Sequence, residues 1–137
     1  MKRIVVIDGQ GGGLGKAVIE RIKKEPWQHH ELLAAGTNAV ATATMIRAGA
    51  DAGATGESAI IWNCRHADIV VGAVGILAAG SMLGELNENM ALAIGSCEAV
   101  KILIPFNKCR LEIAGISEIS LSERLEHMIN LLRHHID

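Results

Sequence analysis

The sequence predicts an α/β three-layer sandwich: a Rossmann-like, doubly wound parallel sheet of about five strands, with one further candidate edge strand. Three observations favour this fold class. Short apolar runs recur at Ile4–Ile7, Asp68–Gly72 and Lys101–Pro105, and such runs are typical of parallel strands covered on both faces. A glycine-rich segment follows the first run directly. Helical patterns separate the strands, as expected for crossover connections.

Length and composition restrict the class of protein. The 137 residues are enough for one domain, residues 1–137, and too few for a nucleotide-binding domain joined to a substrate domain. Half of the residues are apolar, yet there is one Phe and no Tyr, so we expect an aliphatic core. A net charge of −2 without a basic block argues against nucleic acid as a partner. No run reaches membrane-spanning length, and we expect a cytoplasmic protein without a membrane partner.

The first strand, Ile4–Ile7, runs into a loop that carries five glycines in seven positions. Apolar residues then recur every fourth position, which predicts a helix from about Gly13 to Lys24. Free N–H groups and the positive end of the dipole at this start favour an anion. Because each glycine costs backbone entropy, five are more than a tight turn needs. We therefore expect a bound phosphate or nucleotide, with a tight turn that binds nothing as the alternative.

The glycine spacing distinguishes two classes of nucleotide-binding loop. The pattern G-x-G-x-x-G fails because position 14 is Leu. The spacing Gly9-x-x-x-Gly13-x-Gly15 is present, and it resembles the T-G-x-x-x-G-[IL]-G loop of short-chain dehydrogenases. Gly15-Lys16 also looks like the end of a P-loop, but Ala17 replaces the Mg²⁺-binding Ser or Thr and the spacing is one residue too long. The Rossmann-like interpretation is preferred, with NAD(P) or another nucleotide as candidate cofactor.

Asp8 stands at the mouth of this loop, where short-chain dehydrogenases have Thr, and its charge would repel a bound phosphate. One interpretation is that its carboxylate accepts loop N–H groups in an Asx-type turn and stiffens the glycines. The other is that it binds a ribose hydroxyl, a metal or a cationic group of a substrate. Both interpretations stay open at this point.

A second strand, Glu31–Ala35, is followed by Gly36-Thr37-Asn38, and Thr37 or Asn38 is expected to cap a helix that runs to Arg47. Dinucleotide folds usually carry an acidic residue at this point that binds the adenosine ribose, and this chain has none. NAD specificity is therefore not supported. Thr37 and Asn38 could still bind a ribose or a 2′-phosphate.

Beyond this helix, Ala50–Ala54 predicts a weak edge strand, and a further helix is expected from about Glu57 to Cys64. The buried strand Asp68–Gly72 then ends in a glycine turn that reaches Gly75. In a doubly wound sheet this strand lies beside the first one, at the switch point where ligands bind. Gly72 and Gly75 are therefore candidate binding residues.

The segment Ile76–Leu83 is apolar on all sides, which predicts a helix covered by other structure. A subunit interface is the preferred cover, so we expect a homodimer; burial in the protein's own core is the alternative. A helix capped by Asn87 and the strand Lys101–Pro105 follow. Asn107 then lies on the ligand side of the sheet, and Arg110–Gly115 is the candidate edge strand.

The capping box Ser120-x-x-Glu123 begins a final amphipathic helix, which needs no function beyond packing. The complete set of residues expected to bind the nucleotide or phosphate-bearing ligand is Asp8, Gly9, Gln10, Gly11, Gly12, Gly13, Leu14, Gly15, Lys16, Thr37, Asn38, Gly72, Gly75 and Asn107.

No metal site is predicted. Three cysteines at wide spacing form neither a disulfide framework nor a C-x-x-C motif. Cys64-x-His66 could supply two ligands, but isolated cysteines are usually buried small hydrophobes. The pairs His29-His30 and His134-His135 lie in polar settings and are expected to face solvent.

Five segments together resemble one small bacterial family, a domain of unknown function of about this length that is Rossmann-like in pattern and found largely in anaerobic Firmicutes. The segments are Asp8–Lys16, Gly36–Ala39, Gly53–Glu57, Gly80–Glu85 and Ile104–Cys109. The resemblance covers nearly the full length. It implies a fold but no activity.

The residues do not predict an enzymatic mechanism. Short-chain dehydrogenases need a catalytic Tyr with a Lys four positions on, and this chain has no Tyr. Three hypotheses stay open. The preferred one is a non-catalytic nucleotide-binding module or subunit. The second is an enzyme on a small phosphorylated or nucleotide-linked substrate, with Asp8, Asn38, Glu85 and Asn107 at the edge of the sheet. The third is a dimeric structural or assembly protein without a ligand.

Overall fold

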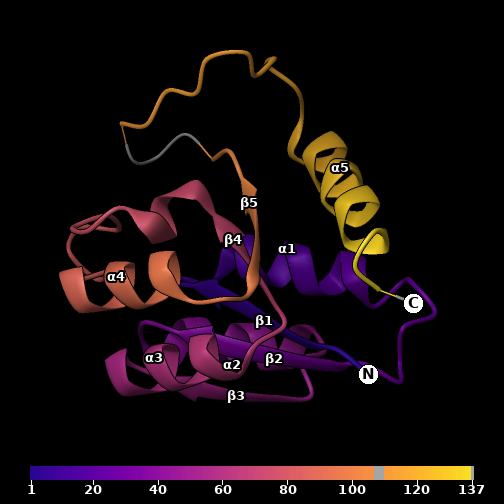
Figure 1. The fold of residues 1–137 in the computed structure, drawn as a ribbon, viewed down its shortest axis with the longest axis horizontal. Coiled ribbons are helices and arrows are strands. Elements are labelled where there is room, and N and C mark those ends of the chain that lie inside the picture. The colour runs from indigo at the N-terminus through magenta and orange to yellow at the C-terminus, as the bar shows by residue number, and fades with distance from the viewer. Residues whose placement is uncertain (107–109, 137) are drawn as a thin grey trace.

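The computed structural model describes residues 1–106 and 110–136. Its centre is a five-stranded, all-parallel sheet in the order β3-β2-β1-β4-β5, which confirms the predicted fold class (Figure 1). The strands are β1 (Arg3–Asp8), β2 (Glu31–Gly36), β3 (Ala52–Thr55), β4 (Ile69–Ala73) and β5 (Val100–Ile104). Because the chain passes from β3 back across β1 to β4, the switch point of this sheet lies between β1 and β4.

Helices cover both faces of the sheet. They are α1 (Gly13–Ile22), α2 (Ala39–Ala48), α3 (Glu57–His66), the short 3₁₀-helix η1 (Val74–Leu77), α4 (Glu88–Ser96) and α5 (Leu121–Arg133). Alternate residues of each strand point to opposite faces. In β1, Ile4 and Val6 pack with residues of α1, α2 and α5, whereas Val5 and Ile7 pack with residues of α3 and α4. The apolar runs of the sequence are therefore buried on both sides.

Three side chains cap helices as the sequence predicts. Asn38 Oδ1 accepts a hydrogen bond from the Ala41 N–H at 2.9 Å, at the start of α2. Asn87 Oδ1 accepts one at the same distance at the start of α4. Ser120 Oγ accepts from the Glu123 N–H at 3.1 Å at the start of α5. Each cap satisfies an N–H group that has no partner inside its helix.

The prediction of a covered helix over Ile76–Leu83 is wrong. Only η1 is helical there, and a series of turns follows it. Ser81 Oγ donates to the Gly75 carbonyl at 2.7 Å, and Met82 and Leu83 both have left-handed backbone angles, with φ of 58° and 55°. Ile76 is buried, but Leu83 is 97% exposed. An apolar composition was mistaken for a buried helix.

Two further expectations are also wrong. Arg110–Gly115 is not a strand, and residues 110–120, which precede α5, arch away from the sheet (Figure 1). His30 does not face solvent: it is 5% exposed, and its Nδ1 accepts the Lys2 N–H at 2.8 Å. The backbone N–H of Lys2, directly before β1, gives Nδ1 a partner, whereas the buried Nε2 has none among the described residues.

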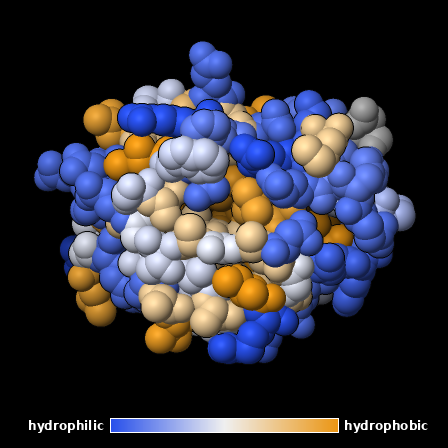
Figure 2. Space-filling model, turned by 90° about the horizontal axis from the view of Figure 1, so that it is seen from below, coloured by the Kyte–Doolittle hydropathy of each residue, from blue (hydrophilic) through white to orange (hydrophobic). Residues whose placement is uncertain are grey.

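The β3 side of the molecule is weakly polar. Figure 2 views the structure from this side and shows apolar and weakly polar side chains in the middle of the face, with hydrophilic ones around them. β3 is itself largely exposed, and α2 exposes Val40 and Ile46. No described segment of this chain pairs with the outer edge of β3.

Candidate functional site

Five glycines lie in the loop after β1 and in the first turn of α1, and they fall into two groups. A Cβ on Gly9 would lie 2.5 Å from Thr37 Oγ1, and one on Gly15 would lie 2.5 Å from Met45 Sδ. Gly12 has a φ of 76° and lies against the backbone of Ala41 in α2. These three glycines are required by close packing or by a left-handed conformation. The fold of the chain itself explains them.

Gly11 and Gly13 are not explained in this way. A Cβ on either would meet no atom within 4 Å, and neither has a left-handed φ. Both are exposed. An alanine would fit the backbone at both positions and would carry a smaller entropic cost. The fold therefore does not need glycine at these two places, and space is left open above the loop.

This open space belongs to a cavity of about 240 Å³ at the carboxyl edge of the sheet. Four other parts of the chain complete the lining: the end of β4, the turns after η1, Phe106 beyond β5, and the start of α5. The lining residues are Asp8, Gly9, Gln10, Gly11, Gly12, Gly13, Leu14, Ala73, Met82, Phe106 and Leu121. One wall is thus glycine backbone, and the other is apolar.

Two N–H groups of the loop remain available. The Gly9 and Gly15 N–H groups donate to Asp8, and the Gln10 N–H donates to Glu85. The N–H groups of Gly11 and Gly13 have no acceptor within the described part of the chain. Gly13 is the first residue of α1, so its N–H lies at the positive end of the helix dipole. The arrangement suits an anion.

Asp8 has the local role that one of the two interpretations assigned to it. Its Oδ1 accepts the Gly9 N–H at 2.8 Å and its Oδ2 accepts the Gly15 N–H at 2.7 Å. The side chain thereby joins the end of β1 to the first turn of α1. Burial raises the pKa of Asp8 above its ordinary value, although the two N–H hydrogen bonds lower it; the charge of Glu85 contributes to the rise. Folding thus disfavours the charged form of Asp8 relative to the unfolded chain.

An Asp8→Asn variant is expected to change how stability depends on pH. Since the pKa of Asp8 is raised in the folded protein, its contribution is fully present below its ordinary value of 3.8 and is lost as pH rises through the folded-state pKa. The parent should therefore lose stability relative to Asp8→Asn as pH rises above 3.8 and through the raised folded-state pKa. Urea denaturation of both proteins at several pH values measures this difference. A difference that stays constant with pH would contradict the raised pKa.

Glu85 fixes the outer side of the loop. Its Oε1 accepts the Gln10 N–H at 2.8 Å, the Thr37 hydroxyl at 2.6 Å and the Asn38 amide at 2.8 Å. These hydrogen bonds, that of Thr37 foremost, hold the pKa of Glu85 below its ordinary value. Asn38 also donates to the Gln10 carbonyl at 2.9 Å. One carboxylate thus connects the ends of β1 and β2 with the turns after η1.

The other described residues of the predicted binding set lie outside the cavity lining. Thr37 and Asn38 are engaged by Glu85, and Asn38 also caps α2. Lys16 is exposed on α1. Gly72 packs against the Ile7 carbonyl, where a Cβ would come within 2.9 Å, and Gly75 is buried in η1. Asn107 lies outside the described residues.

Sequence reasoning missed most of the apolar wall. Ala73, Met82 and Leu121 had no predicted role in binding. They lie at the end of β4, in the turns after η1 and at the start of α5, and only the tertiary fold brings these places together. Leu121 in particular was assigned to a packing helix. The one available signal was the segment Gly80–Glu85 in the family resemblance, which includes Met82 and Glu85.

Among the described residues, no group of three or more His, Cys, Asp or Glu side chains could hold a metal ion. Cys64 is 1% exposed in the core beneath α3, whereas His66 stacks on Trp62 with ring centroids 3.8 Å apart. Although they are two positions apart, these side chains lie in different surroundings.

A comparison with models of protein families shows to which family this chain belongs. The family model DUF3842, described as a domain of unknown function, matches residues 3–137. The chain belongs to the DUF3842 family. No curated protein matches its sequence.

Solved structures show distant similarity to this DUF3842 protein. One is a universal stress protein in complex with cAMP, with 17% identity and a TM-score of 0.44 over 77% of this chain and 98% of the other. Another is a dodecameric FMN-dependent UbiX-like decarboxylase from Escherichia coli O157:H7, with 21% identity and a TM-score of 0.43 over 99% of this chain and 77% of the other.

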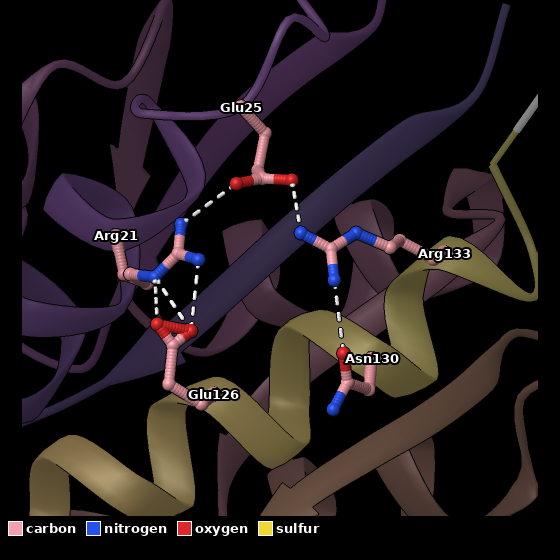
Figure 3. A network of polar contacts seen from close by, with 5 residues as sticks. All are labelled: Arg21, Glu25, Glu126, Asn130 and Arg133. Carbon is pink, nitrogen blue, oxygen red and sulfur yellow. Dashed lines mark hydrogen bonds and ion pairs between the residues drawn. The ribbon is translucent and has the colours of Figure 1, made fainter.

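Helix α5 of the DUF3842 protein is fixed by a network of charges (Figure 3). Arg21 of α1 contacts Glu25 at 3.0 Å and Glu126 of α5 at 2.8 Å, and Arg133 of α5 contacts Glu25 at 2.7 Å. The hydrogen bonds of Arg133 and then Arg21 lower the pKa of Glu25. The network holds α5 beside α1, and so positions Leu121 over the cavity. None of the helices in the described parts of the chain is long and apolar enough to span a membrane.

Proposed function

We propose that this DUF3842 protein binds a phosphate-bearing small molecule, a nucleotide or a related compound, in the cavity beside the glycine loop, as a non-catalytic module or subunit. The observation that carries this proposal is the pair Gly11 and Gly13. Neither packing nor backbone conformation requires glycine there, yet both border the cavity. A ligand that approaches the backbone closely would require it.

The two walls of the cavity suit the two parts of such a ligand. The N–H groups of Gly11 and Gly13 would donate to phosphate oxygens at the start of α1. Phe106, Met82 and Leu121 would pack against an apolar or aromatic part. Asp8 is the one titratable side chain among the described lining residues, and both of its oxygens already accept N–H groups. This favours binding over catalysis.

A thermal-shift screen tests the proposal. The purified protein would be heated with NAD(H), NADP(H), ATP, GTP, FMN, coenzyme A and inorganic phosphate. A ligand at a hundredfold excess over its dissociation constant stabilises the fold by about 2.7 kcal/mol, which raises the melting temperature by several degrees. Stabilisation by one of these compounds supports the proposal. If none of them shifts the transition, the glycine loop is a structural turn.

We also propose that the protein forms a homodimer in which the β3 strands of two copies pair edge to edge. The Asp51 N–H donates to the Leu32 carbonyl, so the alternation of a parallel ladder turns the N–H groups of Ala52 and Ala54 away from β2. This small-residue edge carries neither Lys nor Pro, the residues that usually protect an edge. Pairing of the two β3 edges about a two-fold axis would give the outward N–H groups of both copies hydrogen-bond acceptors. Light scattering should show a dimer that Ala54→Pro dissociates; a monomeric parent would refute it.

A further inference from the structure

Two cysteines lie together on the face of the sheet opposite α1, away from the glycine loop. Cys64 is in the last turn of α3, and Cys97 is the residue directly after α4. Both helices are crossovers of a parallel sheet, so they run in the same direction and their C-terminal ends lie at the same edge. Cys97 packs against the buried cluster that contains Cys64, and it lies close enough to contribute to the raised pKa of the Cys64 thiol.

The two thiols have different surroundings. Cys64 is 1% exposed, and burial, with a smaller effect of Cys97, raises the pKa of its thiol to about 12. Cys97 is half-buried, and it lines a groove of about 510 Å³ between α3 and α4 that is open to solvent. Cys97 therefore borders a groove that is open to solvent, whereas Cys64 is buried and does not line this groove.

Lys101 adds a positive charge beside the accessible sulfur. Its Nζ lies 3.9 Å from Cys97 Sγ and donates to the Cys97 carbonyl at 2.7 Å, which fixes the ammonium group in place. Cys97 sulfur therefore lies beside a fixed cation, and sulfur is the nucleophile in cysteine chemistry. Cys97 thus has an accessible sulfur, a nearby cation and a second thiol within reach. These are the features of a thiol with a resolving partner.

We propose that Cys97 and Cys64 form a redox-active dithiol that closes to an intramolecular disulfide, with a hydroperoxide as the oxidant. The Cys97 sulfur, after giving its proton to solvent, attacks the terminal peroxide oxygen. The O–O bond breaks, Cys97 becomes a sulfenic acid, and the other oxygen leaves as water or an alcohol after taking up a proton. Cys64 sulfur then attacks Cys97 sulfur, the S–O bond breaks, and the Cys64 proton leaves with the oxygen as water. The two sulfurs lose two electrons, and the peroxide gains them.

The disulfide would join α3 to α4. It would close a loop of the chain that contains β4 and η1, the elements that lie between these two cysteines in sequence. This site shares no residue with the glycine-loop cavity, so it does not depend on the proposed ligand.

Mass spectrometry tests the proposal. Protein with Cys109→Ser, so that only the two cysteines remain, would be treated with stoichiometric hydrogen peroxide, blocked with iodoacetamide and digested with trypsin. Cleavage after Arg47, Arg65 and Lys101 separates Cys64 and Cys97 into peptides 48–65 and 66–101. The expected product is these two peptides joined by a disulfide, within a monomer.

Two variants make the result decisive. Cys97→Ser replaces the half-buried thiol, should keep the fold, and should leave Cys64 reduced. Cys64→Ala should leave Cys97 as a sulfenic acid that dimedone labels, with circular dichroism as the check on folding. Free thiols at both positions after peroxide treatment, or a disulfide between two chains, would overturn the proposal. So would oxidation of Cys64 in the Cys97→Ser variant at the parental rate.

Discussion

A Gly36→Ala variant is expected to lose about 3 kcal/mol of its free energy of unfolding. Gly36 ends β2, and a Cβ there would clash with Thr42 Oγ1 and would lie 2.8 Å from the Thr42 N atom and 2.9 Å from the Asn38 carbonyl oxygen. Two of these three atoms belong to the backbone, so no side-chain rotation relieves the overlap. A loss of this size is a large part of the stability of a small domain. Urea denaturation measures it from the shift in midpoint.

Gly11→Ala is the matched control for this variant. The substitution is chemically identical, but the new Cβ would meet no atom within 4 Å. Its stability should stay within about 0.5 kcal/mol of the parent, or rise slightly because the unfolded chain loses freedom. Equal losses in the two variants would mean that the close approach of β2 to the first turn of α2 is not as tight as the structure shows.

A Gly13→Val variant should lose ligand binding while it keeps its fold. Gly13 opens α1, and a side chain there would enter the open space that borders the cavity. At a ligand concentration one hundred times the parental dissociation constant, the stabilisation should fall from about 2.7 to below about 0.4 kcal/mol for a hundredfold loss of affinity. Thermal denaturation with and without the compound found by the screen gives both numbers in one experiment.

Lys16→Ala is the control variant for the loss of binding expected in Gly13→Val. Lys16 lies one turn further along α1, is exposed, and does not line the cavity. The Rossmann-like interpretation predicts binding close to the parental level in this variant, because backbone N–H groups hold the phosphate. The P-loop interpretation requires the lysine at the phosphates. Loss of binding in Lys16→Ala together with full binding in Gly13→Val would reverse the assignment.

The fold was readable from the sequence because its strands are buried on both faces. Ile4–Ile7 and the residues that follow Asp68 lack polar residues at alternate positions, and the structure places these runs in the adjacent inner strands β1 and β4. The helix caps Asn38, Asn87 and Ser120 are local signals, and local signals were interpreted correctly. The fold class therefore needed no knowledge of distant contacts.

The errors have a common physical origin. Ile76–Leu83 was interpreted by hydropathy alone, although Gly80 and Gly84 flank its end and both adopt left-handed angles in the turns. His30 was interpreted by its polar neighbours, but the ring is buried, and the Lys2 N–H donates to its Nδ1 inside the protein. In both cases hydrogen bonds between residues distant in sequence, or between turn residues, outweighed the preference expected from composition.

The candidate site also has one part that the sequence predicts and one part that it does not. The glycine wall is continuous in sequence, so its residues could be named in advance. The apolar wall is assembled from Ala73, Met82, Phe106 and Leu121, which no spacing rule brings together. The sequence alone does not show which glycines the proposed ligand would need. Gly9 and Gly11 look identical in sequence and differ only in the atoms that surround them.

The order of the strands determines how much of the chain must be synthesised before the cavity can be complete. β1 pairs with β2 as soon as residue 36 is available, but its other neighbour, β4, begins at Ile69. The cavity additionally needs Leu121, near the end of the chain. Contacts of such long sequence separation form slowly and late. Ligand binding would consequently report that the whole chain has folded, and a nascent or truncated chain with an intact glycine loop would not yet have a complete pocket.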